Sequence, residues 1–230
     1  MTDDPGPLIA SGRAADVFDL GDGTVLRRYR TVSPDIELEA RIMAYVAERG
    51  FPVPAVHSAD GVDLVMDRID GPTMFERIVA SPWKALWYAR VLARLQRQLA
   101  RTAAPEWLLA STADTSHAQS VLHLDLHPMN VIISPGGPVV IEWTNAAGGP
   151  AGFDAALTYV EIVTFATTTT AERAGQRMFA GAFRRFRGKR SIDAYLAAAC
   201  YHRLADPGPL PDERTAVAAL RSKNAQRRGP

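Results

Sequence analysis

Residues 123–130 read His-Leu-Asp-Leu-His-Pro-Met-Asn, and Glu142-Trp143 follows a short distance downstream. Apolar residues lead into this octet and out of it, and Pro-Gly-Gly-Pro at 135–138 turns the chain into the apolar residues 139–141. This order predicts two short strands around a turn, with the polar side chains fixed at strand ends. Side chains held there by a scaffold can point into a cleft, so the octet is the candidate catalytic loop.

The spacing within the octet indicates a reaction type. Asp125 and Asn130 are five positions apart, as in the catalytic loop of protein kinases, where the Asp receives the acceptor hydroxyl and the Asn holds magnesium. A His or Asp in a loop is more often a solvated or capping residue. The ordered set of His, Asp, His-Pro and Asn, followed by a carboxylate before Trp, favours a functional role over that alternative.

Composition sets the broad class. The chain has 230 residues, enough for one large domain or two small lobes, with 47% apolar and 22% charged residues. A net charge of +1 gives no reason to expect a nucleic-acid or membrane partner. The single cysteine, Cys200, excludes an internal disulfide and suits a reducing cytosol, so we expect a cytoplasmic protein. The N-terminus lacks the apolar region of a signal peptide, and the apolar stretch 155–166 is too short to span a bilayer.

The first seventy residues have the pattern of a small sheet with one helix. Ser33-Pro34 has the composition of a helix start and Gly50 that of a helix end. Short apolar segments separated by turn residues predict five strands, at 8–10, 17–20, 24–29, 55–58 and 62–66.

From Asp70-Gly71-Pro72 onward the pattern becomes helical. Ser81-Pro82 predicts the start of a long helix, and Asp154 the start of another through about Phe165. The apolar side of the first is expected to comprise Trp83, Leu86, Ala89, Val91, Leu92, Leu95 and Leu99. Further helices are predicted at 170–186, 191–204 and 211–222, with loops at 110–120 and 144–152.

These residues resemble the aminoglycoside phosphotransferase and choline kinase-like family, a branch of the protein-kinase-like fold, from Leu8 to about Val163. The octet is similar to the family's catalytic loop, Glu39-Ala40 to its ion-pair helix, and residues 65–71 to its hinge. The resemblance implies an α+β, two-lobed fold. A small antiparallel-sheet lobe with one helix, residues 1–70, would bind nucleotide, and a larger mainly helical lobe, residues 71–230, would carry catalysis and acceptor binding.

The same resemblance implies a role for each matched residue. Asp125 would be catalytic, and ATP and Mg²⁺ would be the cofactors. The nucleotide would be held by Gly12, Arg27, Glu39 and Met66, and the metal by Asn130 and Glu142. Structural support for the loop would come from His123, His127 and Asp154, the last through the segment Gly148-Gly149-Pro150 that precedes it.

The chain departs from the family's pattern at four positions. Leu124 stands where the family usually has Gly, and Arg27 where it has Lys. Glu142 and Gly149 both stand where it has Asp. Arg27 keeps the charge of Lys but is bulkier and prefers bidentate partners. Structural alternatives stay open: a solvent-facing strand residue for Arg27, a surface carboxylate for Glu142, ordinary strand core for Met66 and a plain hairpin at Gly12.

Two functions follow from this pattern. The first is an ATP-dependent phosphotransferase acting on the hydroxyl of a small molecule; the alternative is a catalytically impaired, kinase-like nucleotide- or ligand-binding protein. From Thr144 onward there are thirteen Lys and Arg against seven Asp and Glu. This excess disfavours a polycationic aminoglycoside as the acceptor, unless the charges are only a solvated face and tail. We expect a nucleotide and a small hydroxyl acceptor as partners, and no membrane or nucleic acid.

Overall fold

The computed structural model describes residues 5–12, 14–31, 36–111, 119–206 and 210–228, which form two compact units. Unit 1 comprises Met1–Thr73 and Asn130–Ala146, and unit 2 comprises Met74–Met129 and Ala147–Pro230. The chain therefore leaves unit 1 close to the predicted turn at residues 70–72 and returns to it immediately after the catalytic octet. The predicted division into lobes near residue 70 did not include this return of residues 130–146 to unit 1.

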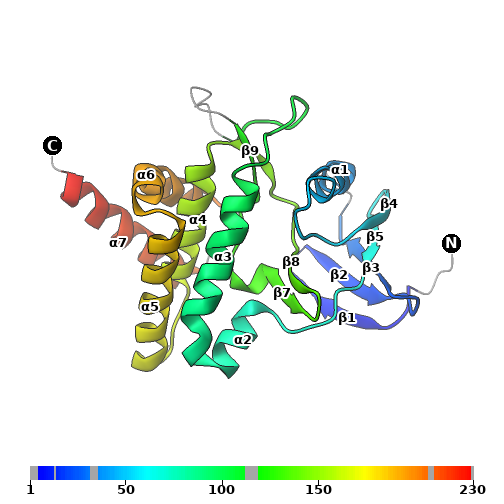
Figure 1. The fold of residues 1–230 in the computed structure, drawn as a ribbon, viewed down its shortest axis with the longest axis horizontal. Helices are drawn as coiled ribbons and strands as arrows, with labels where there is room; N and C mark the ends of the chain where they lie inside the picture. Colours follow the sequence, from blue (N-terminus) through cyan, green and yellow to red (C-terminus); the bar gives the residue numbers. More distant parts are fainter. Residues whose placement is uncertain (1–4, 13, 32–35, 112–118, 207–209, 229–230) are drawn as a thin grey trace. The chain divides into compact units, whose positions relative to one another are not determined.

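Unit 1 is built on a five-stranded sheet in the order β1-β2-β3-β5-β4, in which all neighbours are antiparallel (Figure 1). The predicted five strands are thus present, with ends shifted by a few residues. The central strand β3, Thr24–Tyr29, matches its prediction at both ends, and the turn glycines Gly21 and Gly23 precede it. The other strands are β1 Leu8–Ser11, β2 Ala15–Asp19, β4 Val56–Asp60 and β5 Asp63–Asp67.

Helix α1, Ile36–Ala47, buries residues at helical spacing: Ile36, Glu39, Ile42, Met43 and Val46. The helix ends at Ala47, and the turn that follows closes at Gly50, whose φ of +73° is the left-handed conformation that glycine adopts without strain. The start predicted at Ser33-Pro34 lies outside the described residues. A hairpin of β7, Val131–Ser134, and β8, Gly137–Val140, completes unit 1, and the amide of Val140 donates to the carbonyl of Pro52.

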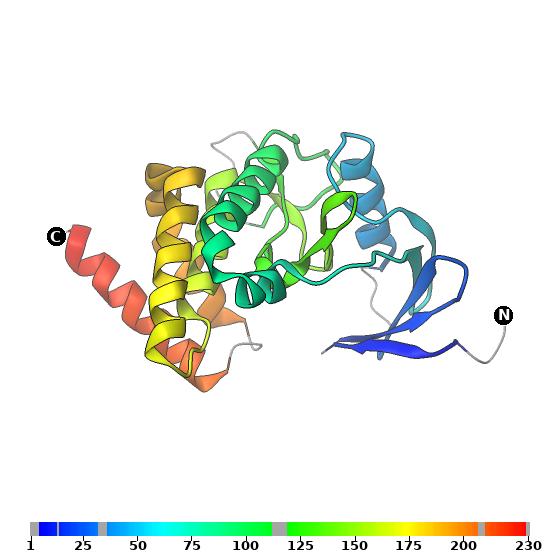
Figure 2. The ribbon, with the colours of Figure 1, turned by 60° about the horizontal axis from the view of Figure 1, so that its bottom comes forward.

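Unit 2 is mainly helical, and its helices lie side by side in both views (Figures 1 and 2). Helix α4 packs on α6, α3 on α5, and α7 on α6. A two-stranded ribbon of β6 and β9 leads into the catalytic octet. The helices are α2 Met74–Ala80, α3 Ala85–Leu99, α4 Ala151–Thr164, α5 Thr170–Arg187, α6 Lys189–Ala205 and α7 Pro211–Arg228. The ribbon strands are β6 Ser120–Leu122 and β9 Ala147–Gly149, and the short 3₁₀ helices are Pro82–Lys84 and Pro128–Asn130.

Three local expectations for unit 2 were wrong. Trp83 and Leu86 are exposed, because the long helix begins only at Ala85, after a 3₁₀ turn, and its covered side starts further along. Gly148-Gly149 is not in a loop but forms part of β9, where backbone carbonyls approach Gly148 and the side chains of Leu122 and Ser111 approach Gly149. Helix α2 was not anticipated.

The start of α4 also differs from its prediction. Pro150 is the N-cap, and Asp154, which was expected to begin the helix, lies inside its first turn and is buried. Among the helices that the structure describes, none combines the length and apolarity required to cross a membrane.

Candidate functional site

Arg27 lies in the middle of unit 1, on the central strand β3 between Val17 of β2 and Leu64 of β5. Arg27 is 4% exposed, which excludes the alternative that it is a solvent-facing strand residue. Its Nη1 donates to Glu39 Oε1 at 3.1 Å, and its Nη2 donates to Glu142 Oε2 at 2.5 Å. Burial works to lower the pKa of Arg27, but the two carboxylates hold it above its ordinary value, so the guanidinium is charged.

Glu39 of α1 is held by more than this one ion pair. Tyr29 donates its hydroxyl hydrogen bond to Glu39 Oε2, and Thr144 Oγ1 lies 3.0 Å from the Tyr29 hydroxyl and 3.4 Å from Glu39 Oε2. Burial raises the pKa of Glu39, against the opposing effect of Arg27 and the hydroxyl groups. The result is a connected polar network in which the charged residues are fixed from several sides.

The hairpin brings the two proposed metal ligands to adjacent positions. Val131 pairs with Val140, and the amide of Ile141 donates to the carbonyl of Asn130, so Asn130 and Glu142 flank the same end of the hairpin. The Glu142 side chain is 41% exposed, although it is tied to Arg27. Its φ of +68° is in the left-handed region, where a residue with a side chain is strained.

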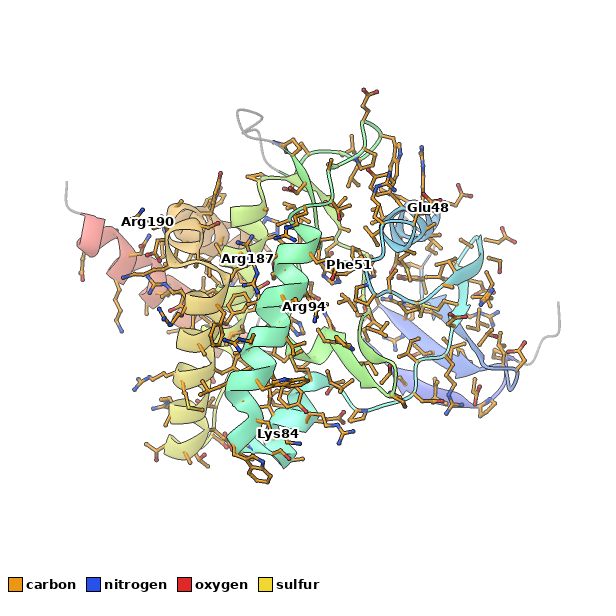
Figure 3. The ribbon with its side chains drawn as sticks, in the orientation of Figure 1. Glu48, Phe51, Lys84, Arg94, Arg187 and Arg190 are labelled. Atoms are coloured by element: carbon orange, nitrogen blue, oxygen red, sulfur yellow. The ribbon has the colours of Figure 1, made fainter. Side chains whose placement is uncertain are left out.

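Trp143 anchors this end of the hairpin in the core of unit 1. The indole is fully buried, its Nε1 donates to the carbonyl of Val140 at 3.1 Å, and its ring meets that of Phe51, which Figure 3 labels, edge to face at 5.5 Å. Because Trp143 is immobilised, the unusual backbone of its neighbour Glu142 is fixed in place.

The other two residues predicted to hold nucleotide are in separate parts of the sheet. Gly12 is exposed at the turn between β1 and β2, where its amide donates to the carbonyl of Ala15 at 2.8 Å. Met66 is buried in β5, between Val25 of β3 and Val56 of β4. The contacts of Gly12 are those of a plain hairpin, and the contacts of Met66 are those of ordinary strand core. Their binding role therefore stays a prediction.

In unit 2, Asp125 is surrounded by histidines. His123 is fully buried, and its Nδ1 accepts from the amide of Asp125 at 3.2 Å. His127 Nε2 lies 3.4 Å from Asp125 Oδ1, and its Nδ1 accepts from the amide of Met129. Burial would raise the pKa of Asp125, but the hydrogen bond and charge of His127, with His123 and Arg203, bring it below its ordinary value. Asp125 is therefore a carboxylate near neutral pH.

Asp154 braces the loop from α4. Its two oxygens accept from the amide of Leu124 at 2.8 Å and from the amide of His123 at 3.3 Å. Gln96 of α3 donates to Asp154 and to Thr158, which joins two helices to the loop. Leu124 has a φ of +63°, so the position at which the resembling family has Gly requires a left-handed backbone. The amide hydrogen bond from Leu124 to Asp154 holds this conformation despite the side chain.

The donor set fits magnesium carried by a nucleotide better than a metal held by protein alone. Among the described residues, no group of three or more His, Cys, Asp or Glu side chains could hold a metal ion. Asn130 and Glu142 supply hard oxygen atoms, which magnesium prefers, and magnesium commonly takes one or two protein ligands with phosphate oxygens completing its shell.

Sequence reasoning missed Tyr29, Thr144 and Glu161 as parts of these sites. Tyr29 lies two positions after Arg27 on one strand, so strand alternation places both side chains on one face. Thr144 directly follows Trp143. Glu161 is a charged residue in the otherwise apolar stretch of α4 and lies two helical turns after Asp154. Each of these signals was present in the sequence.

Comparison with known proteins identifies the fold and the family. Aminoglycoside phosphotransferase APH(4)-Ia superposes with a TM-score of 0.66 at 16% identity, covering 97% of this chain and 93% of that one. The streptomycin–ATP complex of APH(2")-IIa gives 0.60 at 13%, covering 85% and 82%, and amicoumacin kinase hAmiN gives 0.55 at 14%, covering 100% and 90%. At these identities the similarity establishes the fold, and the predicted two-lobed, kinase-like α+β class is confirmed.

No curated protein sequence matches the chain. The model of the phosphotransferase enzyme family (APH) matches residues 6–113 and 69–205, which together span most of the sequence. The resemblance inferred from the octet is confirmed, and the chain belongs to the phosphotransferase enzyme family.

Proposed function

We propose that the chain is an ATP-dependent phosphotransferase that moves the γ-phosphate to a hydroxyl of a small molecule. The observation that carries this proposal is the state of Asp125. It is a carboxylate with a lowered pKa, on a loop braced by Asp154 and the buried His123. Phosphoryl transfer is mostly positioning and charge neutralisation, and a fixed, ionised acceptor of a hydroxyl proton is what it requires.

In this mechanism Asp125 accepts a hydrogen bond from the acceptor hydroxyl and orients its oxygen. As that oxygen bonds to the γ-phosphorus and the bond to the ADP oxygen breaks, the hydroxyl proton passes to Asp125. His127 Nε2, 3.4 Å from Asp125 Oδ1, helps to hold the Asp125 side chain in this orientation.

Unit 1 would hold the nucleotide phosphates. Arg27 would supply positive charge to them, and Glu39 with Tyr29 would keep the guanidinium in place. Asn130 and Glu142 would ligate Mg²⁺, which when bound neutralises phosphate charge and orients the β- and γ-phosphates. Solved relatives include complexes with ATP, ADP and AMP-PNP, which supports a nucleotide as substrate.

The two units suggest how nucleotide binding and catalysis are divided along the chain. We retain residues 1–70 as the nucleotide-binding part and 71–230 as the part that carries catalysis and binds the acceptor. The segment 130–146 is the exception, since it folds with unit 1 and takes both proposed metal ligands with it. A cytoplasmic location is also retained, on the evidence of the single cysteine.

For the acceptor, we retain an alcohol that is not a polycationic aminoglycoside. The basic segment 184–190 is only partly available, because Arg184 is paired with Asp193, and Arg187, which Figure 3 labels, donates to the carbonyl of Ala151 in α4. Its exposed cations are Arg185, Lys189 and Arg190. Greater activity on an aminoglycoside than on neutral and acidic alcohols would contradict this proposal.

A second candidate is a nucleotide- or ligand-binding protein that does not turn over. The contact that favours it is the ion pair from Arg27 to Glu142 at 2.5 Å. It engages the proposed metal ligand and part of the positive charge meant for the phosphates. Binding of a metal–nucleotide complex would have to compete with this pair.

Two measurements and one control variant separate the candidates. Magnesium-dependent stabilisation by ATP in a thermal shift assay, in the wild type and in Asp125→Asn, would establish the nucleotide site. The phosphotransferase predicts ATP consumption with a suitable alcohol that falls about 10²- to 10⁴-fold in Asp125→Asn. Asp193→Asn, outside both sites, is the matched control and should retain activity. ATP binding without turnover for any acceptor would favour the second candidate, and absence of ATP binding would exclude both.

A further inference from the structure

Glu161 of α4 is a buried carboxyl group that the proposed mechanism does not use. Its side chain is 5% exposed, and among the described residues no donor group gives a hydrogen bond to either carboxyl oxygen, while the Asp125 carboxylate lies beside it as an acceptor. Buried polar groups are normally hydrogen-bonded, because a charge without a partner in a low-dielectric interior is strongly unfavourable. A carboxyl group in this position therefore needs a physical explanation.

The charged groups that face Glu161 are Asp125, Asp154 and Arg203. Arg203 of α6 is the only cation of the three, and its Nη1 is 4.0 Å from Glu161 Oε1, beyond hydrogen-bond distance. The same guanidinium is 2.9 Å from Asp206 and 3.9 Å from Glu213. One arginine shared among three carboxyl groups cannot compensate a full negative charge on Glu161 as well as that of Asp125.

The neighbouring carboxyl groups of Asp125 and Glu161 share a proton unequally. Asp125 is partly exposed and has His127 at 3.4 Å, so it is the better site for the negative charge. Glu161 is enclosed in the helical core. Burial, followed by the charge of Asp125, raises the pKa of Glu161 well above its ordinary value, whereas that of Asp125 is lowered. Environments that separate two carboxyl groups in this way assign them different roles.

We propose that Glu161 is a positioning residue for Asp125: it keeps the proton of the pair and directs it toward the Asp125 carboxylate. This role rests on the proposed phosphotransferase function. Glu161 acts only through Asp125, because its own oxygens are closed to solvent and to an acceptor. With the proton on Glu161, Asp125 stays ionised and accepts a hydrogen bond on its buried side. Its more exposed side then faces the acceptor hydroxyl.

Two substitutions of similar size test whether Glu161 donates a hydrogen bond to Asp125. Glu161→Gln keeps an N–H donor toward Asp125, and Glu161→Met removes it. We expect Glu161→Gln to retain most of the wild-type kcat, and Glu161→Met to lose about tenfold in kcat with an unchanged KM for ATP. Equal loss in two variants that melt at the wild-type temperature would overturn the proposal.

The pH profile separates positioning from a purely structural role. In the wild type, kcat/KM should fall at alkaline pH, when Glu161 loses its proton beside Asp125, and this limb should be absent in Glu161→Gln. The fall in kcat/KM at acid pH, where Asp125 is protonated with His123 and His127 beside it, should occur at the same pH in Glu161→Gln as in the wild type. If Glu161 were instead an ionised partner of Arg203, the Gln variant would shift the acid limb to lower pH and keep any alkaline limb.

A spectroscopic measurement tests the proton without any reaction. The infrared difference spectrum of wild type minus Glu161→Gln at neutral pH should show the C=O stretch of a protonated carboxylic acid. Its absence overturns the proposal even in an active enzyme. The band in a protein that transfers no phosphate would overturn the phosphotransferase function and the positioning role together, and leave only the proton on Glu161.

Discussion

Arg27 is the residue on which the polar network of unit 1 depends, because one buried guanidinium faces two carboxylates. Its neighbour Arg28 points to the opposite face and pairs with Asp63 in a half-exposed ion pair. The two arginines thus provide a comparison of burial within one strand, at the same charge and side-chain length.

We expect Arg27→Met to lower the free energy of unfolding by about 3 kcal/mol, since it leaves Glu39 buried without its cation. Arg28→Met should cost less than about 1 kcal/mol, because solvent screens its pair. Urea denaturation of both variants measures the difference. Similar losses would mean that Arg27 is not held by its carboxylates.

Leu124 provides a second test at the residue scale. Its left-handed φ is strained with a side chain and relaxed with glycine. Leu124→Ala and Leu124→Gly both lose the buried leucine side chain, but only the glycine variant also relieves the strain. We expect Leu124→Gly to be more stable than Leu124→Ala by about 1 kcal/mol.

The control for Leu124 is Leu122, which lies two residues earlier in β6. There glycine should be the less stable variant by about 0.5–1 kcal/mol, as is usual in a strand. The same order at both positions, measured by denaturant unfolding, would contradict the argument from φ.

At the element scale, the contact of α4 with α6 depends on Gly152. A Cβ atom there would come within 2.6 Å of the Tyr195 ring and 2.9 Å of Ser191 Oγ. We expect Gly152→Ala to destabilise the protein by about 1–3 kcal/mol through overpacking. Gly175 of α5 has nothing within 4 Å of its Cβ position, so Gly175→Ala should stabilise by about 0.5–1 kcal/mol. Melting temperatures of the two variants should move in opposite directions.

Secondary structure was predicted well where local chemistry determines it. The strand at Thr24–Tyr29 has glycine turns before it, and the helix that ends at Ala47 has a glycine beyond its last turn. Trp83 and Leu86 were misplaced because helical periodicity identifies an apolar side but does not say which end of that side is covered. Gly148-Gly149 was misread because glycine composition is the same in a turn and in a strand that others approach closely.

For the site, the spacing within the octet predicted Asp125 and Asn130, and the family resemblance added His123, His127 and Asp154 as support residues. The partners of Arg27 could not be derived in this way, because Glu142 is 115 positions away along the chain. That distance also explains why Arg27 and Glu142 look in the sequence like two independent departures from the family pattern. The structure joins them in one ion pair, and tertiary contacts of this kind leave no local pattern.

At the scale of the whole molecule, the single cysteine reports on opening of the core. Cys200 of α6 is buried, and burial raises its pKa to about 11. Because the thiolate is the reactive form, the native protein should react with a thiol reagent at neutral pH at least about 10²-fold more slowly than the unfolded chain. Labelling followed by mass spectrometry, with and without urea, measures this ratio. Equal rates would mean that the helical core opens readily.

The return of the chain to unit 1 has a consequence for its synthesis. Residues 1–73 emerge from the ribosome first, but Glu142 follows Arg27 by 115 positions, roughly 6 to 23 seconds later at ordinary rates of translation. During that interval the guanidinium at the centre of the sheet has Glu39 but lacks its second carboxylate, and Phe51 lacks Trp143. The sheet is therefore translated long before its central arginine has both carboxylates, and a gene fragment that stops at residue 73 would encode all five strands without Glu142 and Trp143.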